Sequence, residues 1–276
     1  MKTIRRGSFG LSVLLLSVNG LAQNPPAIPG QFFPFPEGFK TGFGNLPLAD
    51  STNLLSIPVA VAPYYENALI LDTANLTPAF LNYNVLDTVP TAHKNLNYPA
   101  GTVLFYFAPG WASVSQGGTG PGQTACFVGG GDWRSNSPNG LLAICADAGG
   151  SNLYFGGEGP GGAVTYARAP ISWGSNTFHQ VGVEWSQDDC EIYLDGALAA
   201  TGNGVTIVPA RSTWTNGFFI GSDDAGYEQA RGAFWAMVTW TSEYGAYYTN
   251  GWLSLSNAIV SWQTGQQEGG FQKMGG

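Results

Sequence analysis

The stretch 177–204, TFHQVGVEWSQDDCEIYLDGALAATGNG, predicts three consecutive antiparallel strands. Apolar residues alternate with others from Val181 to Trp185, which is the two-residue period of a strand with one buried face. A polar turn and a second alternating run follow. Asp195 and Gly196 then form a strong hairpin signal, because a tight primed turn requires positive φ at both of its central residues. The stretch therefore predicts a meander with one apolar face.

A four-residue first turn sets the register of the first two strands. It places Trp185 opposite Cys190 on the apolar face. Glu184 then lies opposite Glu191 on the other face, where we expect both glutamates to be exposed to solvent.

The same stretch resembles the laminin-G-like family, within the concanavalin A-like lectin and glucanase jelly rolls of secreted bacterial proteins. That family has an aromatic-His-X-Val-X-Val strand, a polar turn and a Tyr-X-Asp-Gly strand, which here are 178–183 (FHQVGV) and 193–196 (YLDG). Its next strand resembles 219–222 (FIGS), and its closing strand begins at the position of 231–234 (RGAF). The acidic pair that usually follows is replaced by WA at 235–236, so no role is carried over for that pair. The resemblance implies a jelly-roll sandwich of two antiparallel sheets, and a secreted module that binds carbohydrate or a protein surface.

Composition favours the same all-β class. The 276 residues include 40 Gly, 16 Phe, 12 Tyr and 9 Trp, and only 10% are charged. Such a chain is typical of a sandwich with long loops rather than of a helical bundle or a disordered protein. Further strands are expected at 68–72, 80–85, 102–107, 126–128, 141–145, 153–155, 164–167, 218–220 and 233–241.

The chain divides into four predicted segments. Residues 1–22 have the order of a secretory signal, with a basic start, a short apolar run and a small-residue cleavage site. Residues 23–63 are rich in Pro, Phe and Gly and indicate a leader or spacer. The jelly-roll domain is expected over 64–262, followed by a Gly- and Gln-rich tail at 263–276. We therefore expect a secreted protein, extracellular or periplasmic.

Charge and hydropathy exclude two kinds of partner. The net charge is −8 at pH 7, which disfavours nucleic acid and anionic membrane surfaces. After the signal, no apolar run approaches the roughly 18 residues that cross a membrane, so no membrane span is expected.

The three cysteines allow two interpretations. Cys126 and Cys145 lie in strands that pair across the loop 129–140, and the symmetric register puts them directly opposite each other. A disulfide between them is our preferred prediction. The alternative is that these two and Cys190 are buried free thiols, since cysteine is commonly a small core residue.

Acidic loops supply the candidate binding site. Asp132, Trp133, Asp223, Asp224 and Tyr227 lie between predicted strands, where a sandwich presents its binding loops. Tryptophan and tyrosine rings can stack on sugars, while carboxylates and loop carbonyls suit Ca²⁺, which members of the resembled superfamily bind at the loop rim. The sequence thus predicts a glycan or protein ligand, with calcium as a possible cofactor. Ordinary polar loops are the alternative.

Catalysis is the less favoured hypothesis, and no catalytic residue is assigned. Glu184 and Glu191 face each other at the separation that suits a retaining glycosidase, but they lack the single-strand Glu-X-Asp-X-Glu arrangement of jelly-roll glycosidases. His179 falls where a structural hydrogen bond is expected. The GEGPGG pattern at 157–162 is expected to be a loop, since no helix follows it to hold a pyrophosphate. A structural or adhesion domain of a larger exported protein remains the third hypothesis.

Overall fold

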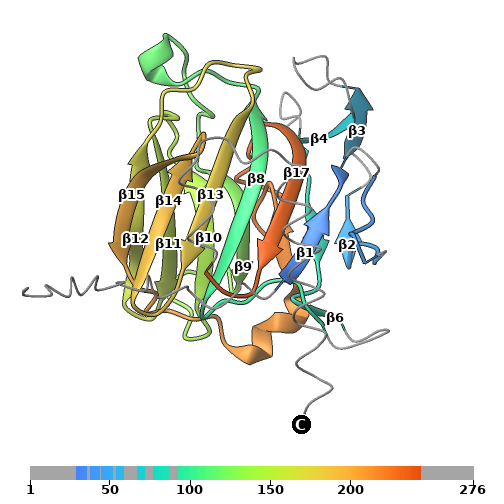
Figure 1. Ribbon diagram of the computed structural model, residues 1–276, viewed down its shortest axis with the longest axis vertical. Coiled ribbons are helices and arrows are strands. Elements are labelled where there is room, and N and C mark those ends of the chain that lie inside the picture. Colours follow the sequence, from blue (N-terminus) through green and yellow to red (C-terminus); the bar gives the residue numbers. More distant parts are fainter. Residues whose placement is uncertain are drawn as a thin grey trace, which may run out of the picture.

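The computed structural model describes residues 29–35, 38–43, 45–51, 54–58, 67–71, 77–87 and 93–243. They form a sandwich of two antiparallel sheets, as predicted, and Figure 1 shows one sheet lying in front of the other. The predicted signal at 1–22 and the tail at 263–276 lie outside the described residues. Within them, no helix is long and apolar enough to cross a membrane.

We call the first sheet the β8 sheet. Its described strands follow the order β15-β14-β13-β8-β17-β4-β3, and β1 also pairs with β17. Their bounds are β1 Pro29–Phe33, β3 Leu55–Pro58, β4 Asn67–Leu71, β8 Gly101–Pro109, β13 His179–Trp185, β14 Asp189–Leu194, β15 Ala197–Asn203 and β17 Gly232–Trp240.

We call the second sheet the β10 sheet. Its described strands follow the order β12-β11-β10-β9-β16-β5-β2. Their bounds are β2 Ala49–Asp50, β5 Leu81–Tyr83, β9 Ala125–Gly131, β10 Leu141–Ala146, β11 Asn152–Gly159, β12 Gly162–Pro170 and β16 Phe218–Ile220. A small hairpin (β6 Leu86–Asp87, β7 His93–Lys94) and two 3₁₀ turns (η2 Val114–Gln116, η3 Arg211–Asn216) complete the described elements.

Aromatic side chains fill the space between the sheets. Phe105 and Phe107 of β8 meet Phe127 of β9, with ring centroids 5.5 and 4.9 Å apart. All three are fully buried. Trp185 of β13 packs on Phe155 of β11 at 5.3 Å, and its indole N–H donates to the carbonyl of Tyr98 at 2.8 Å. Large rings contributed by both sheets therefore hold the layers together.

The predicted register of the meander is confirmed, but the prediction that its second face is exposed to solvent is wrong. Trp185 lies opposite Cys190, and Glu184 lies opposite Glu191. Glu184, however, is only 6% exposed, so the prediction of two solvent-exposed glutamates is wrong. The outer face of the β8 sheet carries bulky buried side chains such as Tyr106 and Trp235. Alternation shows that one face is apolar, but it does not show that the other is open.

The hairpin turn has the predicted conformation. Asp195 has φ 51° and Gly196 has φ 80°, so both central residues are left-handed. The Asp195 carboxylate accepts a hydrogen bond from the backbone N–H of Gln180 at 2.8 Å and bonds Nδ1 of His179 at 2.9 Å. The turn is thereby tied to the start of β13, which gives His179 the structural role expected for it.

The segment predicted as a leader contributes strands to both sheets. Within 23–63, β1 pairs with β17, β2 with β5 and β3 with β4. Phe33 and Phe35 are 1% and 0% exposed, in the core. The predicted domain boundary near residue 64 therefore does not match the sheets. These strands are short, and β1 and β3 each contain a proline, so the alternation that marks a strand in sequence is missing.

The cysteines are free thiols. Cys126 and Cys145 are directly opposite each other on β9 and β10, as predicted, but no disulfide joins them, so our preferred prediction is not met. All three cysteines are buried, as in the alternative interpretation. A hydrogen bond with Cys145, followed by burial, raises the pKa of Cys126 well above its ordinary value. The sulfur therefore stays in the thiol form, which is the unreactive one.

Candidate functional site

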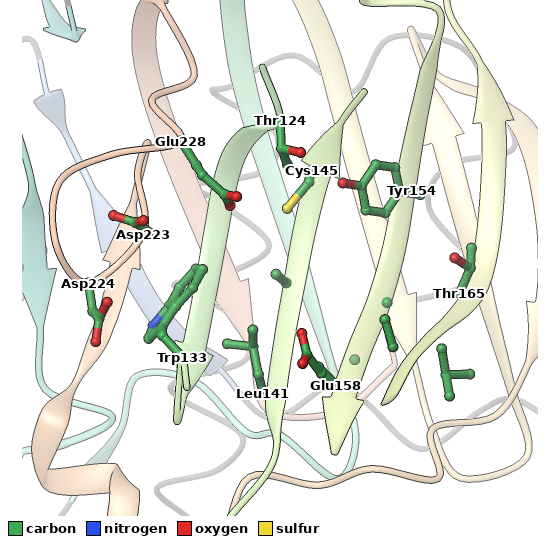
Figure 2. A pocket seen from close by; sticks show the side chains of 15 residues that line it. Thr124, Trp133, Leu141, Cys145, Tyr154, Glu158, Thr165, Asp223, Asp224 and Glu228 are labelled. Atoms are coloured by element: carbon green, nitrogen blue, oxygen red, sulfur yellow. The ribbon is translucent and has the colours of Figure 1, made fainter. Parts of the chain in front are cut away.

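A pocket of about 320 Å³ lies on the outer face of the β10 sheet (Figure 2). Leu142 and Ile144 point into the core, so Leu141, Ala143 and Cys145, which alternate with them on β10, face outward. We call this pocket the groove. It is lined by Thr124, Trp133, Leu141, Ala143, Cys145, Tyr154, Gly156, Gly157, Glu158, Ala163, Val164, Thr165, Asp223, Asp224 and Glu228.

Small residues make the hollow. Ala143 on β10 and Gly156 on β11 leave the middle of the outer face nearly bare of side chains. The sequence pattern at 157–162 is not the predicted loop: Gly157 and Gly159 belong to β11, and only residues 160–161 turn the chain into β12. The interpretation against a dinucleotide site stands, since a strand rather than a helix follows.

Trp133 forms one wall. It follows β9, and its ring lies over Gly129, where an added Cβ would approach the ring carbons to 2.7 Å. The edge of Phe219 supports the ring at a centroid distance of 6.3 Å. The indole nitrogen is buried and has no hydrogen-bond partner among the described residues. An N–H donor in this state is costly unless water or a ligand accepts its proton.

Carboxylates stand on two sides of the groove. Asp223, Asp224 and Glu228 come from the loop between β16 and β17, and Glu158 comes from β11 (Figure 2). Asp223 Oδ1 accepts hydrogen bonds from the backbone N–H groups of Ala225 at 3.1 Å and Tyr227 at 2.6 Å, which shapes the loop.

Partial burial and neighbouring negative charges raise the pKa of two of these carboxyl groups. Burial raises the pKa of Asp224, and the negative charges of Asp223 and Asp132 raise it further. Burial and Asp223 also raise the pKa of Glu228. Glu158 accepts two hydrogen bonds, one from Ser135 Oγ at 2.9 Å and one from the backbone N–H of Asn136 at 2.7 Å. The groove thus offers several carboxylate oxygens as acceptors.

Tyr154 closes the end of the groove near Cys145 (Figure 2). Burial raises the pKa of its phenol above the ordinary value, and the hydroxyl bonds the side chain of Thr124. The phenol therefore stays protonated at neutral pH. It gives the groove an aromatic surface opposite the wall that Trp133 forms.

The lining contains no lysine or arginine. Arg134 is adjacent in sequence but is engaged by Asp132, with Nε and Nη2 donating to its two carboxylate oxygens at 2.9 and 2.5 Å. Arg168 lies opposite Tyr154 in the strand register and is exposed, outside the lining. The charge inside the groove is therefore negative.

The structure separates the five residues predicted as ligand-binding. Trp133, Asp223 and Asp224 line the groove together. Asp132 is 8% exposed and accepts hydrogen bonds from Arg134, Ser137 and Asn139, which hold its pKa below the ordinary range. Tyr227 is 56% exposed and is not part of the lining.

Sequence reasoning missed Tyr154, Glu158 and Glu228. Glu158 sits inside the glycine pattern that predicted a loop. On a strand, alternation would have placed it on the outer face with Tyr154.

Calcium, expected from the sequence as a possible cofactor, stays a prediction. Among the described residues, no three His, Cys, Asp or Glu side chains converge as metal ligands would. Calcium prefers six to eight oxygen ligands. Three carboxylates of the groove share the loop between β16 and β17, and Glu158 comes from β11.

Glu184 and Glu191 belong to the other sheet. They face each other on β13 and β14 of the β8 sheet, away from the groove. The hydroxyl of Tyr193 donates to Glu191, and burial followed by that bond raises the pKa of Tyr193. The pair therefore has the predicted register without the predicted exposure.

Solved structures share this fold at low sequence identity. Domain 4 of AbnA, an extracellular GH43 arabinanase from Geobacillus stearothermophilus in complex with arabinotriose, aligns at TM-score 0.51 and 9% identity, over 87% of this chain and all of that one. Trypanosoma rangeli sialidase in complex with a difluoro-KDN ligand aligns at TM-score 0.56 and 16% identity. That alignment covers 86% of this chain and 34% of the sialidase, so the chain spans about a third of the enzyme. No protein-family model and no curated protein matches the sequence. The chain thus shares a two-sheet β-sandwich fold with these solved structures.

Proposed function

We propose that this protein is a carbohydrate-binding module whose ligand lies in the groove on the β10 sheet. The observation that carries the proposal is the combination of a tryptophan wall and carboxylates around one hollow on the outer face of the sheet. Aromatic rings pack on the apolar faces of sugars, and carboxylates accept hydrogen bonds from hydroxyl groups. A volume of about 320 Å³ is at the lower end of the ordinary range for small-molecule sites.

The solved neighbours support the proposal at the level of the fold. Both belong to carbohydrate-active proteins, and both have a sugar or sugar analogue bound. Fold alone does not decide function, so the argument rests on the groove.

The test is a glycan array followed by titration calorimetry on the best hit, using the full chain and three variants. Trp133→Ala is expected to weaken binding at least tenfold, because it removes the aromatic ring that forms one wall of the groove. The affinity of Trp133→Phe is expected to lie between those of the parent and Trp133→Ala, since phenylalanine keeps an aromatic face. Tyr227→Ala is the matched control: it removes an exposed aromatic beside the groove, outside the lining, and is expected to bind as the parent does. Unchanged binding by Trp133→Ala would exclude the groove.

The same titration addresses calcium. Because the described carboxylates do not converge, affinity is expected to be equal with Ca²⁺ and with EDTA. A strong dependence on Ca²⁺ would place the ligand elsewhere on the chain.

The proposed role is non-catalytic binding in an exported protein. The signal-like order of residues 1–22 supports export, and mass spectrometry of the secreted protein is expected to find Gln23 at its N-terminus. A glycoside hydrolase using Glu184 and Glu191 is the second candidate, favoured by their cross-strand register. Sugar release that is lost in Glu191→Gln would support that candidate against ours.

A further inference from the structure

The charge of the groove bears on which sugars it accepts. We propose that the groove selects glycans by charge, accepting uncharged and amino sugars and rejecting sugars that carry a carboxylate or sulfate, and that Asp224 and Glu228 make this selection. The inference rests on the proposed function, because the same groove is the site.

Carboxylates surround the place where a ligand would lie. The loop between β16 and β17 brings Asp224 and Glu228 to one side of the groove, and Glu158 stands on the other side, with the Trp133 ring between Asp224 and Glu158 (Figure 2). The described lining offers an anionic ligand no cationic side chain. Trp133 contributes the uncharged surface of its ring to the lining.

The neighbouring cations are committed elsewhere. Arg134 makes a bidentate ion pair with Asp132, and its charge is therefore largely balanced. Arg231 donates to the carbonyl oxygen of Pro121 at 2.5 Å. Arg168 is exposed beside Tyr154 and interacts with Asp147. None of these arginines is part of the lining, and Arg168 shares the outer face of the sheet with Tyr154.

The groove already carries an excess of negative charge when empty. Asp223 raises the pKa of both Asp224 and Glu228, with burial as the larger cause in each case. A further anion would add to this repulsion, while the ammonium of an amino sugar would relieve it. An uncharged sugar is neither repelled nor attracted by this charge, and its hydroxyl groups can donate hydrogen bonds to the carboxylates.

The experiment uses an array of oligosaccharides in matched stereochemistry: glucose, glucosamine and glucuronic acid, and galactose, galactosamine and galacturonic acid. Full-length protein is titrated with the best series at pH 7. The acidic member is expected to bind at least tenfold more weakly than the neutral one. The amino member is expected to bind at least threefold more tightly, an advantage that 0.5 M salt removes, because exposed charges are screened.

A double variant, Asp224→Asn with Glu228→Gln, assigns the effect to the two residues. It keeps their shapes and is expected to bring the acidic and neutral affinities within threefold of each other. The control, Asp50→Asn with Asp188→Asn, removes the same number of charges from exposed positions outside the groove and is expected to keep the parent's ratio.

The outcomes separate the two proposals. Binding of acidic sugars as tightly as neutral ones, or a double variant with an unchanged ratio, would overturn the charge selection and leave the carbohydrate-binding function standing. An array on which no sugar binds would overturn both.

Discussion

At the scale of single residues, the missing side chain at Gly129 decides where the Trp133 ring lies. The ring carbons occupy the space that a Cβ would take, with contacts that would be 2.7 and 2.8 Å. Real Cβ atoms do not approach so closely, so the ring would have to move. The glycine is therefore as much a part of the groove as the tryptophan it supports.

Gly129→Ala is accordingly expected to weaken glycan binding several-fold while leaving the fold intact, because it displaces the ring from the wall of the groove. Titration calorimetry measures the glycan affinity, and near-ultraviolet circular dichroism checks that the fold is intact. Gly161→Ala is the matched control, since nothing lies within 4 Å of its added Cβ. Equal binding by the two variants would mean that the ring position does not matter.

The charged form of Asp224 destabilises the folded protein by an amount that depends on pH. Its pKa is raised in the folded protein from the ordinary value of 3.8, so the folded state holds the proton more tightly than the unfolded chain does. The penalty is absent below about pH 3.8, grows as pH rises through the raised pKa, and is complete above it.

Asp224→Asn is therefore expected to raise the melting temperature at pH 7 and to have little effect near pH 3.5. Thermal melts of parent and variant at both values test this. Asp188→Asn, an exposed change in the turn between β13 and β14, is expected to be neutral at both. A gain for Asp224→Asn that persists at low pH would show that charge is not its cause.

At the scale of elements, local signals explain what the sequence could predict. The meander of β13, β14 and β15 has the expected register because a two-residue period and an Asp-Gly turn are both encoded within a few residues. Cys126 and Cys145 were predicted to be opposite from a symmetric register across the loop 129–140, and they are opposite in a ladder that has a register shift between Ile144 and Cys145. The burial of Glu184 was not predicted, because it depends on what covers a face.

The groove was only partly predictable. Trp133 and the acidic loop at 223–224 stand out in sequence, but the floor beside them comes from β10 and β11, which are separate strands of the sheet. The floor itself consists of glycine and alanine, and a hollow made by missing side chains has no sequence pattern of its own. Only the pairing of the strands brings the two walls together.

The hairpin turn between β14 and β15 supplies a prediction at this scale. Gly196 has φ 80°, and a β-branched side chain there is opposed by steric contact with the backbone. Gly196→Val is expected to destabilise the protein by at least about 1 kcal/mol in urea melts. Gly174→Ala, at a position without positive φ and with little contact, is the control. Unchanged stability in Gly196→Val would contradict the turn assignment. Lost sugar binding without lost stability would place the ligand at the turn.

At the scale of the whole molecule, the segment before residue 59 joins the two sheets. Strands β1 and β3 extend the β8 sheet, while β2 lies at the edge of the β10 sheet. Between them the chain buries Phe33, whose ring contacts Tyr83 at 4.8 Å and Phe218 at 5.9 Å. Phe35 packs against Phe234 at 6.4 Å. A segment that reads as a spacer in sequence thus places rings against both layers.

A chain that begins at Tyr64 is therefore expected not to fold, whereas one that begins at Gln23 is expected to fold normally. Loss of a buried phenylalanine costs about 3–5 kcal/mol, and two such losses approach the roughly 5–15 kcal/mol by which whole domains are stable. Near-ultraviolet circular dichroism and urea unfolding of the two purified chains give the measurement.

Phe33→Ala and Phe35→Ala in the longer chain separate the effect of the rings from that of the missing strands. Each is expected to lower stability by about 3–5 kcal/mol without abolishing folding. Leu46→Ala, in the same segment but 66% exposed, is expected to change stability by less than about 0.5 kcal/mol. A cooperative urea transition in the chain that begins at Tyr64 would show that residues 64–243 hold the sandwich without β1, β2 and β3, and that the segment is a spacer after all.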